Sequence, residues 1–479
     1  MHRSFEPGWI GGRLCLAVAL IAMIASCSPS SAPNSNAGPP VTIKVWDWNA
    51  GESYYKQGFD NFNKQHSNIK VEYTFQQSST FSTVVQSAFQ SGAAPDIFMS
   101  YFAPMADLMS KGWVQPIGNA TDSDVAAWMK TFPADSFKSN IHVFDGKVYS
   151  FPYLPQGTIY LYYNKTVLQA AGVSEPPKTW SELRADAKKV TQSSGGKSYG
   201  LVTGGKDNWP WFMNVSYLAA TAGACTDGVL GAPPIAFDYS KGQYHPNNPA
   251  TAAAIQLWLD MKRDGTTMPG IDSLTDADAH AAFGNGKAAF FFSGNWTPSV
   301  LSQVAPSADF GVAPVPVPDS GRKGYMLLDP AGRTWVISSK TKSRGAAFEV
   351  IKYMTSLPFQ QGYVKSGAGF SVFPAANTDQ TITSKGMFDV YQVTVTTTKP
   401  APVLPPVVRQ VTPKFSDPAY TQVLQGIWDG KLNATQGLAD LENRMNTALA
   451  DGIAAAKQAG SAVTPADFVA SVGSNCGGV

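Results

Sequence analysis

The chain has 479 residues, of which 44% are hydrophobic, 12% aromatic and 15% charged. This length exceeds the roughly 100–200 residues of a typical domain, so we expect two or three lobes. The composition excludes a disordered tail, a collagen-like repeat and a coiled coil. The net charge of +2 leaves no basic surface for nucleic acid, and the five histidines lack the spacing of a zinc site. We therefore expect neither a nucleic-acid partner nor a metal or other cofactor.

The N-terminal residues predict export and a lipid anchor. An apolar run over 14–25 follows two arginines, and it is shorter than the about 20 residues that span a bilayer, so it fits a signal peptide. The run ends in Ile-Ala-Ser-Cys, which resembles the lipobox whose cysteine, here Cys27, receives a lipid. The alternative is an ordinary signal peptide with an incidental cysteine.

Residues 28–40 contain only Ser, Pro, Asn, Ala and Gly, which is the composition of a flexible tether. We expect a signal peptide over 1–26, a tether over 27–40, and a body held on the outer face of the cell membrane by lipid alone. Cys225 and Cys476 are the other cysteines of the mature chain. The oxidising exterior favours a disulfide between them, and two unrelated thiols are the alternative.

Patterns typical of strands and helices alternate from Val41 onward, which predicts an α/β fold with a parallel sheet. Short apolar or alternating runs predict strands over 41–46, 69–75, 96–99, 158–163, 201–202, 287–292, 310–315 and 334–337. Apolar residues at helical spacing predict helices over 55–62, 179–190, 252–262, 347–354 and 438–449. Thr179 and Glu182 add a capping-box pattern to the second of these helices.

Catalytic motifs find no support in the chain. The stretch 196–200 matches the nucleophile elbow G-x-S-x-G, but that elbow needs a strand before it and a helix after it, and here the order is reversed. Paired carboxylates for glycoside hydrolysis leave no local signature, because their separation is a three-dimensional property. We therefore predict no catalytic residues and a protein that is not an enzyme.

Four aromatic clusters follow strand-like runs, at 46–49, 101–102, 209–212 and 294–296. Ligands of open α/β sheets bind beyond the carboxyl ends of strands, where these clusters lie. Trp46 is inside its strand, so we expect it in the core. We predict ligand contact for Trp48, Trp211 and Trp296 instead, because we place them in loops, which carry function. Flat aromatic faces among Asn, Gln, Asp and Arg side chains suit the apolar faces and hydroxyl rims of a carbohydrate.

Six short motifs occur in a fixed order along the body of the chain. They are SGAAPDIF at 91–98, GWVQP at 112–116, DGKVY at 145–149, YYNK at 162–165, PKTWSEL at 177–183 and FGNGKAA at 283–289. Each motif is loose, but the ordered set behind a lipobox is specific. Over about 41–450 the chain resembles the family 1 extracellular solute-binding proteins of ABC transporters, the maltose-binding-protein-like group.

The resemblance implies a type II periplasmic-binding-protein-like fold, an α/β fold of two discontinuous lobes that close on a solute. It assigns 41–150 plus 316–370 to lobe 1 and 156–311 plus 375–475 to lobe 2. Proline restricts the backbone to extended conformations, which suits stiff connecting strands. Hinge segments are expected near the proline-containing stretches 151–155, 312–318 and 367–374.

The resemblance also implies ligand contacts where its motifs align with this chain. The predicted ligand-binding residues are Trp48, Asn49, Tyr101, Phe102, Gln156, Trp209, Trp211, Trp296, Asp329, Arg333 and Phe370. Gln156 stands at a position that is often acidic in maltose binders, so the hydroxyl chemistry differs there. Arg333 is equally compatible with a surface charge.

The leading hypothesis is a monomeric, lipid-anchored receptor that captures a carbohydrate and delivers it to the permease subunits of an ABC transporter. An exported glycan-degrading enzyme with the same body is the alternative from another class. A third hypothesis is a receptor of the same fold for a non-sugar solute, such as a polyamine or a metal. Only Asp47 and Asp329 are well placed for a polyamine, and we find no clustered metal ligands in the sequence.

Overall fold

The computed structural model describes residues 40–48, 51–100, 105–153, 159–207, 209–227, 235–328, 334–378, 380–383, 385–473 and 476. The predicted signal peptide, the tether up to residue 39 and Cys27 lie outside the described residues. Both of the larger sheets belong to one compact unit that begins at Pro40. Within the described ranges, no helix is long and apolar enough to cross a membrane.

A five-stranded sheet joins early and late parts of the chain. Its strands are, in spatial order, β2 (Ile69–Phe75), β1 (Val41–Asp47), β3 (Ile97–Met99), β16 (Trp335–Ser338) and β4 (Val114–Gln115). β1 pairs in parallel with β2 and β3, whereas β16 is antiparallel to β3 and β4. The sheet is therefore mixed, and the expectation of a parallel sheet was incomplete because the late strand β16 enters it in the opposite direction.

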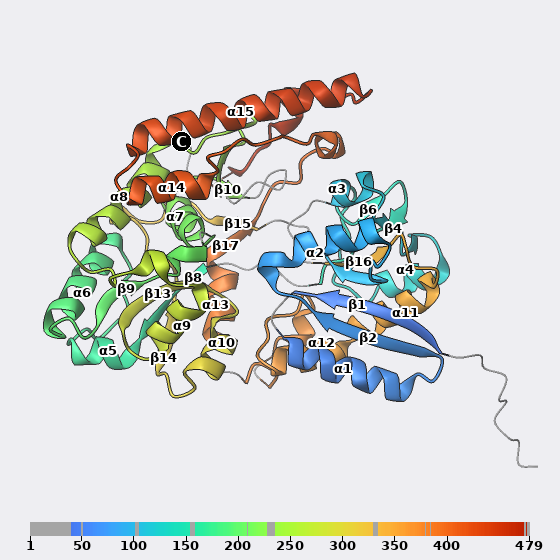
Figure 1. Cartoon of the computed structure of the whole chain (residues 1–479), viewed down its shortest axis with the longest axis horizontal. Helices are drawn as coiled ribbons and strands as arrows, with labels where there is room; N and C mark the ends of the chain where they lie inside the picture. Colours follow the sequence, from blue (N-terminus) through green and yellow to red (C-terminus); the bar gives the residue numbers. More distant parts are fainter. Residues whose placement is uncertain are drawn as a thin grey trace, which may run out of the picture. The chain divides into compact units, whose positions relative to one another are not determined.

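Apolar periodicity explains how helices cover this sheet. α1 (Glu52–Gln65) carries Tyr55, Phe59 and Phe62 at helical spacing and packs on β2 with these side chains buried. α12 (Leu357–Lys365) lies beside α1 (Figure 1). A helix from the last third of the chain thus completes the layer begun by the first helix.

A four-stranded sheet comes from the middle of the chain. Its spatial order is β14 (Phe310–Ala313), β8 (Ile159–Asn164), β13 (Ala288–Gly294) and β9 (Tyr199–Val202). β13 is parallel to β9, and β8 is antiparallel to both β13 and β14. Every residue of β13 is buried, which explains the uninterrupted apolar run of this central strand.

The predicted helices are confirmed, with ends that follow capping chemistry. α6 (Trp180–Ser193) begins at the predicted capping box, in which Thr179 and Glu182 each accept a hydrogen bond from the other's backbone. Asn248 caps the next predicted helix by accepting a hydrogen bond from Thr251 N. This capped helix is α8 (Pro249–Arg263), and the last two predicted helices are α11 (Arg344–Met354) and α15 (Ala434–Gln458).

The structure corrects the predicted loop at the aromatic stretch 209–212. The sequence predicts a loop there, but the structure places these residues in the first turn of α7 (Trp209–Thr221). Pro210 is compatible with this, because proline is tolerated in the first helical turn. α7 packs on α8 and on α14 (Tyr420–Trp428), and α14 in turn lies along α15 (Figure 1).

The remaining helices and strands complete the two sheets' surroundings. The helices are α2 (Ser78–Ser91), α3 (Met105–Ser110), α4 (Ser123–Met129), α5 (Lys165–Ala170), α9 (Asp276–Gly284), α10 (Thr297–Val304) and α13 (Met387–Thr397). The strands are β5 (Gly118–Asn119), β6 (Val143–Phe144), β7 (Lys147–Val148), β10 (Thr226–Asp227), β11 (Ile235–Asp238), β12 (Gln243–Tyr244), β15 (Met326–Leu328) and β17 (Thr398–Pro400). The 3-10 turns are η1 (Gly205–Asp207), η3 (Ile271–Ser273), η4 (Pro374–Ala376), η5 (Pro406–Gln410) and η6 (Pro465–Phe468).

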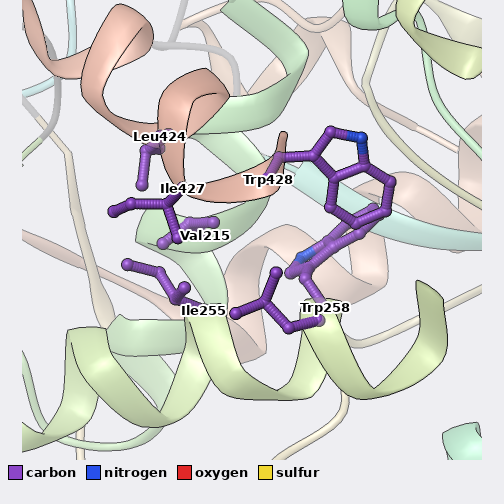
Figure 2. Close-up of a pocket in the computed structure, with 7 residues that line it drawn as sticks. Val215, Ile255, Trp258, Leu424, Ile427 and Trp428 are labelled. Carbon is purple, nitrogen blue, oxygen red and sulfur yellow. The ribbon is translucent and has the colours of Figure 1, made fainter. Parts of the chain in front are cut away.

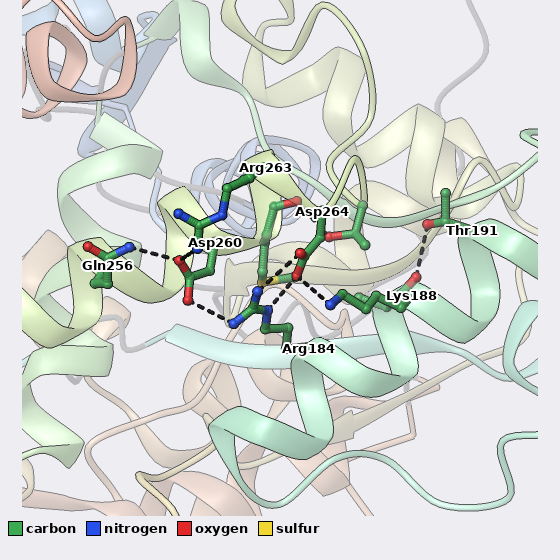
Figure 3. A network of polar contacts seen from close by, with 10 residues as sticks. Arg184, Lys188, Thr191, Gln256, Asp260, Arg263 and Asp264 are labelled. Atoms are coloured by element: carbon green, nitrogen blue, oxygen red, sulfur yellow. Dashed lines mark hydrogen bonds and ion pairs between the residues drawn. The ribbon is translucent and has the colours of Figure 1, made fainter.

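A charged network joins α6 to α8 (Figure 3). Arg184 donates from Nη1 to Asp260 at 2.8 Å and from Nη2 to Asp264 at 3.0 Å, and its Nε also contacts Asp264. Lys188 Nζ lies 3.1 Å from the same Asp264 carboxylate. The hydrogen bonds from Arg184 are the main reason that the pKa of Asp264 is lowered to about 2. The network therefore stays charged at neutral pH and connects the two helices.

The predicted disulfide is present in the structure. Cys225 and Cys476 are bridged, with their Cα atoms 5.3 Å apart and a sequence separation of 251. The segment before Cys476 is also held by its backbone, since Ala470 N donates to Tyr239 O at 3.0 Å. The end of the described chain is thus fixed next to β10 and β11.

Candidate ligand-binding site

The carboxyl end of β1 holds a buried carboxylate. Asp47 is fully buried, and its Oδ2 accepts a hydrogen bond from the Tyr73 hydroxyl at 3.2 Å. Its Oδ1 accepts a hydrogen bond from Trp48 N at 2.6 Å. Burial, followed by the negative charge of Asp47, raises the pKa of Tyr73, so this hydroxyl stays protonated and donates. Asp47 therefore fixes the backbone at the point where β1 ends.

Trp48 departs from the position expected of a loop residue, whereas Trp46 packs against the core as expected but is only partly buried. Trp48 is only 8% exposed and belongs to the core of the five-stranded sheet, with its ring centroid 6.4 Å from that of Phe81. Trp46 is half-buried and packs at the edge of the same core. A side chain directly after a strand can still turn back into the core, which a loop assignment does not reveal. Ligand contact by Trp48 remains a prediction.

Thr334 brings three predicted site segments together. Its carbonyl accepts a hydrogen bond from Ser100 N at 2.8 Å, at the end of β3. Its Oγ1 accepts another from Phe151 N at 3.0 Å, at the start of the predicted first hinge segment. Thr334 itself directly precedes β16. Ser100, Phe151 and Thr334, which flank the three predicted segments, therefore meet where β3 ends and β16 begins.

Several predicted ligand-binding residues lie outside the described residues. They are Asn49, Tyr101, Phe102, Gln156, Asp329 and Arg333. The backbone of Trp209 and Trp211 lies in the first turn of α7, a helix that packs against the four-stranded sheet. Phe370 is 3% exposed, and its ring centroid lies 5.4 Å from that of Tyr391 in α13. The roles of all these residues in ligand binding remain predictions.

Trp296 is the half-buried aromatic residue just beyond the carboxyl end of β13. It is the N-cap residue of α10 and packs against the core of the four-stranded sheet with one part of its surface. Its ring covers Gly294, where an added Cβ would lie 1.9 Å from Trp296 Cζ3. The indole therefore has a defined position at the strand end.

A buried polar network lies beside Trp296. His280 is fully buried, with Nδ1 2.8 Å from Asp276 O and Nε2 3.1 Å from Thr297 Oγ1. Thr297 Oγ1 in turn donates to Ser293 Oγ at 2.8 Å. These contacts connect α9, β13 and α10, so the network fixes the elements that carry Trp296. The sequence reading missed Asp276 and His280; the Thr275–Asp278 capping box at the start of α9 was the available signal.

Burial keeps the two titratable groups of this network neutral. It lowers the pKa of His280 to about 4. Burial first, and then the nearby charge of Asp207, raises the pKa of Asp276 to about 7. His280 Nδ1 lies 3.5 Å from Asp276 Oδ2, but both side chains are uncharged between these two pKa values. The pair is therefore a contact between neutral groups in that range, not an ion pair.

Other parts of the structure fit a ligand less well. An apolar pocket between α7, α8 and α14 is lined by Val215, Ile255, Trp258, Leu259, Leu424, Ile427 and Trp428 (Figure 2). Apart from the indole N–H groups of Trp258 and Trp428, this lining offers no hydrogen-bonding side chain for a hydroxyl group. Among the described residues, no group of three His, Cys, Asp or Glu side chains could hold a metal ion.

The G-x-S-x-G stretch lies in the turn between α6 and β9, so a helix precedes it and a strand follows it, as predicted. Ser198 Oγ donates to Gly286 O at 2.7 Å in this turn.

The comparisons with known proteins decide the family. The sequence model of the bacterial extracellular solute-binding proteins matches residues 46–361. The chain belongs to this family. A relative among these binding proteins, from Brucella abortus (strain 2308), is 27% identical over 256 residues, covering 52% of this chain and 56% of the relative. The sn-glycerol-3-phosphate-binding periplasmic protein of Yersinia enterocolitica is 27% identical over 243 residues, covering 48% of this chain and 52% of that protein.

The chain thus spans about half the length of the curated relatives that it matches. Among solved structures, the GacH receptor of Streptomyces glaucescens, solved unliganded and with acarbose, aligns with a TM-score of 0.66. The two proteins are 20% identical, and the alignment covers 86% of this chain and 99% of that chain. At this identity the likeness shows the fold, which is that of the two-lobed periplasmic solute-binding proteins and confirms the predicted class.

Proposed function

We propose that this solute-binding protein captures a carbohydrate outside the cell and delivers it to the permease of an ABC transporter. The observation that carries the proposal is the half-buried Trp296 indole at the carboxyl end of β13, where α/β sheets bind ligands. Its flat face suits the apolar face of a sugar ring. The GacH receptor, which has the same fold, was solved with a carbohydrate of this kind, acarbose.

The proposal includes two lobes that close on the solute. The strands of one sheet lie before residue 116 and at 335–338, and those of the other lie between 159 and 313. This division supports lobes built from 41–150 with 316–370 and from 156–311 with 375–475. A ligand that touches both lobes stabilises the closed form, because only that form completes its contacts.

The lipid anchor through Cys27 and the extracytoplasmic location are part of the same proposal. Cys27→Ala should abolish incorporation of labelled palmitate and move most of the protein out of the membrane fraction. Ser28→Ala is a matched control, because it changes the neighbouring residue but leaves Cys27 and the Cys225–Cys476 bridge intact. Normal lipid labelling and membrane retention of Cys27→Ala would exclude this anchor.

A polyol phosphate is the second candidate ligand. The relative from Yersinia enterocolitica binds sn-glycerol-3-phosphate, and this ligand shares hydroxyl groups with a sugar but adds a dianionic phosphate. Binding of the phosphate would require cationic side chains at the site, for which Arg333 is the candidate in the sequence. A sugar receptor needs no such charge, so the two candidates are separable by ligand.

The test is a panel of acarbose, maltotriose, xylotriose, sn-glycerol-3-phosphate and spermidine. A ligand that binds the folded protein raises its unfolding temperature, and calorimetry then gives the affinity. We expect a sugar to bind and to be recovered unchanged by chromatography. Recovery of cleaved sugar would favour the exported glycan-degrading enzyme, and binding of spermidine or glycerol phosphate alone would exclude the carbohydrate receptor.

A further inference from the structure

We propose that Thr334 is a positioning residue of the solute site, because its hydroxyl fixes the start of the first predicted hinge segment to the five-stranded sheet. The identity of the solute rests on the proposed function, whereas the contacts of Thr334 do not depend on it. Thr334 acts through the segments that it joins and is not assigned a contact with the solute. The hinge segment 151–155 is thereby narrowed, since its first residues move with the sheet.

Thr334 uses its backbone and its side chain for different neighbours. Its carbonyl accepts a hydrogen bond from Ser100 N at 2.8 Å and so continues the pairing of β16 with β3. Its Oγ1 accepts a hydrogen bond from Phe151 N at 3.0 Å, and the hydroxyl donates to Trp335 O at 3.3 Å. A change of side chain can therefore remove the bond to Phe151 and leave the sheet pairing in place.

Burial makes the bond to Phe151 important. Phe151 is fully buried and Thr334 is 4% exposed. A buried N–H that loses its partner costs free energy, because water is not there to replace the bond. Phe151 itself is not part of a strand, so its N–H depends on this side-chain oxygen rather than on a ladder of backbone bonds.

Aromatic packing holds the same short segment. The Phe151 ring makes an edge contact with Trp128 of α4, with the ring centroids 5.3 Å apart. Tyr153 is also fully buried, and its ring centroid lies 5.9 Å from those of Phe151 and of Trp335 in β16. A bend within 151–153 would pull these rings out of the core, which is unfavourable. Residues 151–153 therefore stay with the five-stranded sheet when the lobes move.

The junction of Ser100, Phe151 and Thr334 is where its influence on the solute begins. Three predicted ligand-binding residues lie within five residues of this junction in sequence, namely Tyr101, Gln156 and Arg333. The junction fixes the points of the chain from which they depart. If the hydroxyl is lost, these points can shift relative to one another, and the ligand must restore their order at an entropy cost.

Amide hydrogen exchange, read by mass spectrometry at residue resolution, tests the junction directly. We expect the Phe151 amide to be protected in the wild type and in Thr334→Ser, which keeps the hydroxyl. In Thr334→Val it should exchange up to about tenfold faster, the loss of one hydrogen bond, while the Ser100 amide stays protected. Addition of ligand to the wild type should leave the Phe151 amide unchanged, because this residue does not move against the sheet.

Calorimetric affinity for acarbose, or for the panel ligand that binds most tightly, is the second readout. We expect Thr334→Val to bind up to about tenfold more weakly and Thr334→Ser to bind nearly as the wild type does. Thr341→Val is the matched control. Thr341 is also buried and its Oγ1 accepts a backbone hydrogen bond, from Ser343 N at 3.3 Å, but it follows the other end of β16. This control should lose stability and keep its affinity.

A Phe151 amide that exchanges no faster in Thr334→Val, or equal losses of affinity in Thr334→Val and Thr341→Val, would overturn the proposal. If Thr334→Val does not fold, the wild type decides: retained protection of Phe151 on ligand binding supports the fixed junction, and lost protection overturns it. Absence of binding to every panel ligand would instead overturn the proposed function, and the exchange rates of the free proteins would still decide the contact between Thr334 and Phe151.

Discussion

Trp296 is the residue at which packing and ligand binding can be separated. Trp296→Ala removes a half-buried ring, and loss of an aromatic anchor typically costs ~2 kcal/mol of binding free energy, about thirtyfold in affinity. The unliganded protein should lose less than the roughly 3–5 kcal/mol expected for a core aromatic residue. Calorimetry with the best panel sugar and urea unfolding of the free protein measure the two effects.

Trp113→Ala is the matched control for that variant. Trp113 is also half-buried, stacks on Phe89 at 4.7 Å, and accepts a hydrogen bond at its carbonyl from Ser339 N. Ser339 follows the last residue of β16, and β16 runs antiparallel to β3. Trp113 therefore lies near the amino end of β3, at the opposite end of the strands from the predicted site. We expect its loss to lower stability and leave affinity unchanged. The reverse pattern in the two variants would make Trp296 a packing residue.

Asp276 and His280 should give pH dependences of opposite sign. The pKa of Asp276 is raised from 3.8 to about 7, so the folded protein holds a proton that the unfolded chain has lost, and stability falls as pH rises through this window. The pKa of His280 is lowered from 6.5 to about 4, so the unfolded chain binds the extra proton and stability rises with pH up to about 6.5.

The two variants Asp276→Asn and His280→Gln expose these slopes. Relative to the wild type, Asp276→Asn should gain stability as pH increases from 4.5 to about 7, because it lacks the cost of ionising a buried acid. The free energy of unfolding of His280→Gln, relative to that of the wild type, should be highest at low pH, and this difference should disappear by about pH 6.5. Urea midpoints at four pH values suffice, and parallel profiles for all three proteins would contradict both assignments.

At the scale of elements, the Arg184 network should couple α6 to α8. Arg184→Met keeps the apolar stem but removes the hydrogen bonds to Asp260 and Asp264, and we expect a loss of about 1 kcal/mol in the free energy of unfolding. Arg263→Met is the control, because its side chain is 67% exposed and contacts Asp260 alone. Equal urea midpoints for the two variants would show that the network adds nothing to the packing of the helices.

The stability lost in Arg184→Met should also depend on pH. The pKa of Asp264 is lowered to about 2, so its contribution is present above the ordinary range of a carboxyl and disappears as pH falls towards 2. We therefore expect the difference between wild type and Arg184→Met to be constant near neutral pH and to shrink below about 4.

At the scale of the whole molecule, the Cys225–Cys476 bridge closes a very long loop. The bond joins residues that are 251 apart in sequence, and in the loop-entropy model a closure of this length stabilises the folded state by ~5 kcal/mol. Reduction with dithiothreitol should lower the urea midpoint of the wild type. The variant with both cysteines changed to alanine should match the reduced protein and ignore dithiothreitol, and two titratable thiols in the unreduced, unfolded mature protein would contradict the bridge.

Local patterns in the amino-acid sequence determined much of the fold by themselves. The capping box at Thr179 and Glu182, the spacing of Tyr55, Phe59 and Phe62, and the strict alternation in 69–75 predicted elements that the structure confirms. These signals are strong because helices and strands have fixed periods and helix ends have few satisfactory partners. The ordered motifs likewise predicted the family and its two-lobed fold.

The tertiary structure decided what depends on contacts between distant segments. β16 joins the sheet of β1 and β3 from more than 200 residues away, Trp48 turns into the core, and the stretch at 209–212 opens a helix. The contact between the Trp296 ring and Gly294 is also invisible in sequence, because two residues of spacing do not reveal which way a ring folds back. Periodicity reports how a segment pairs with its own neighbours, whereas burial and side-chain direction depend on which distant surface that segment meets.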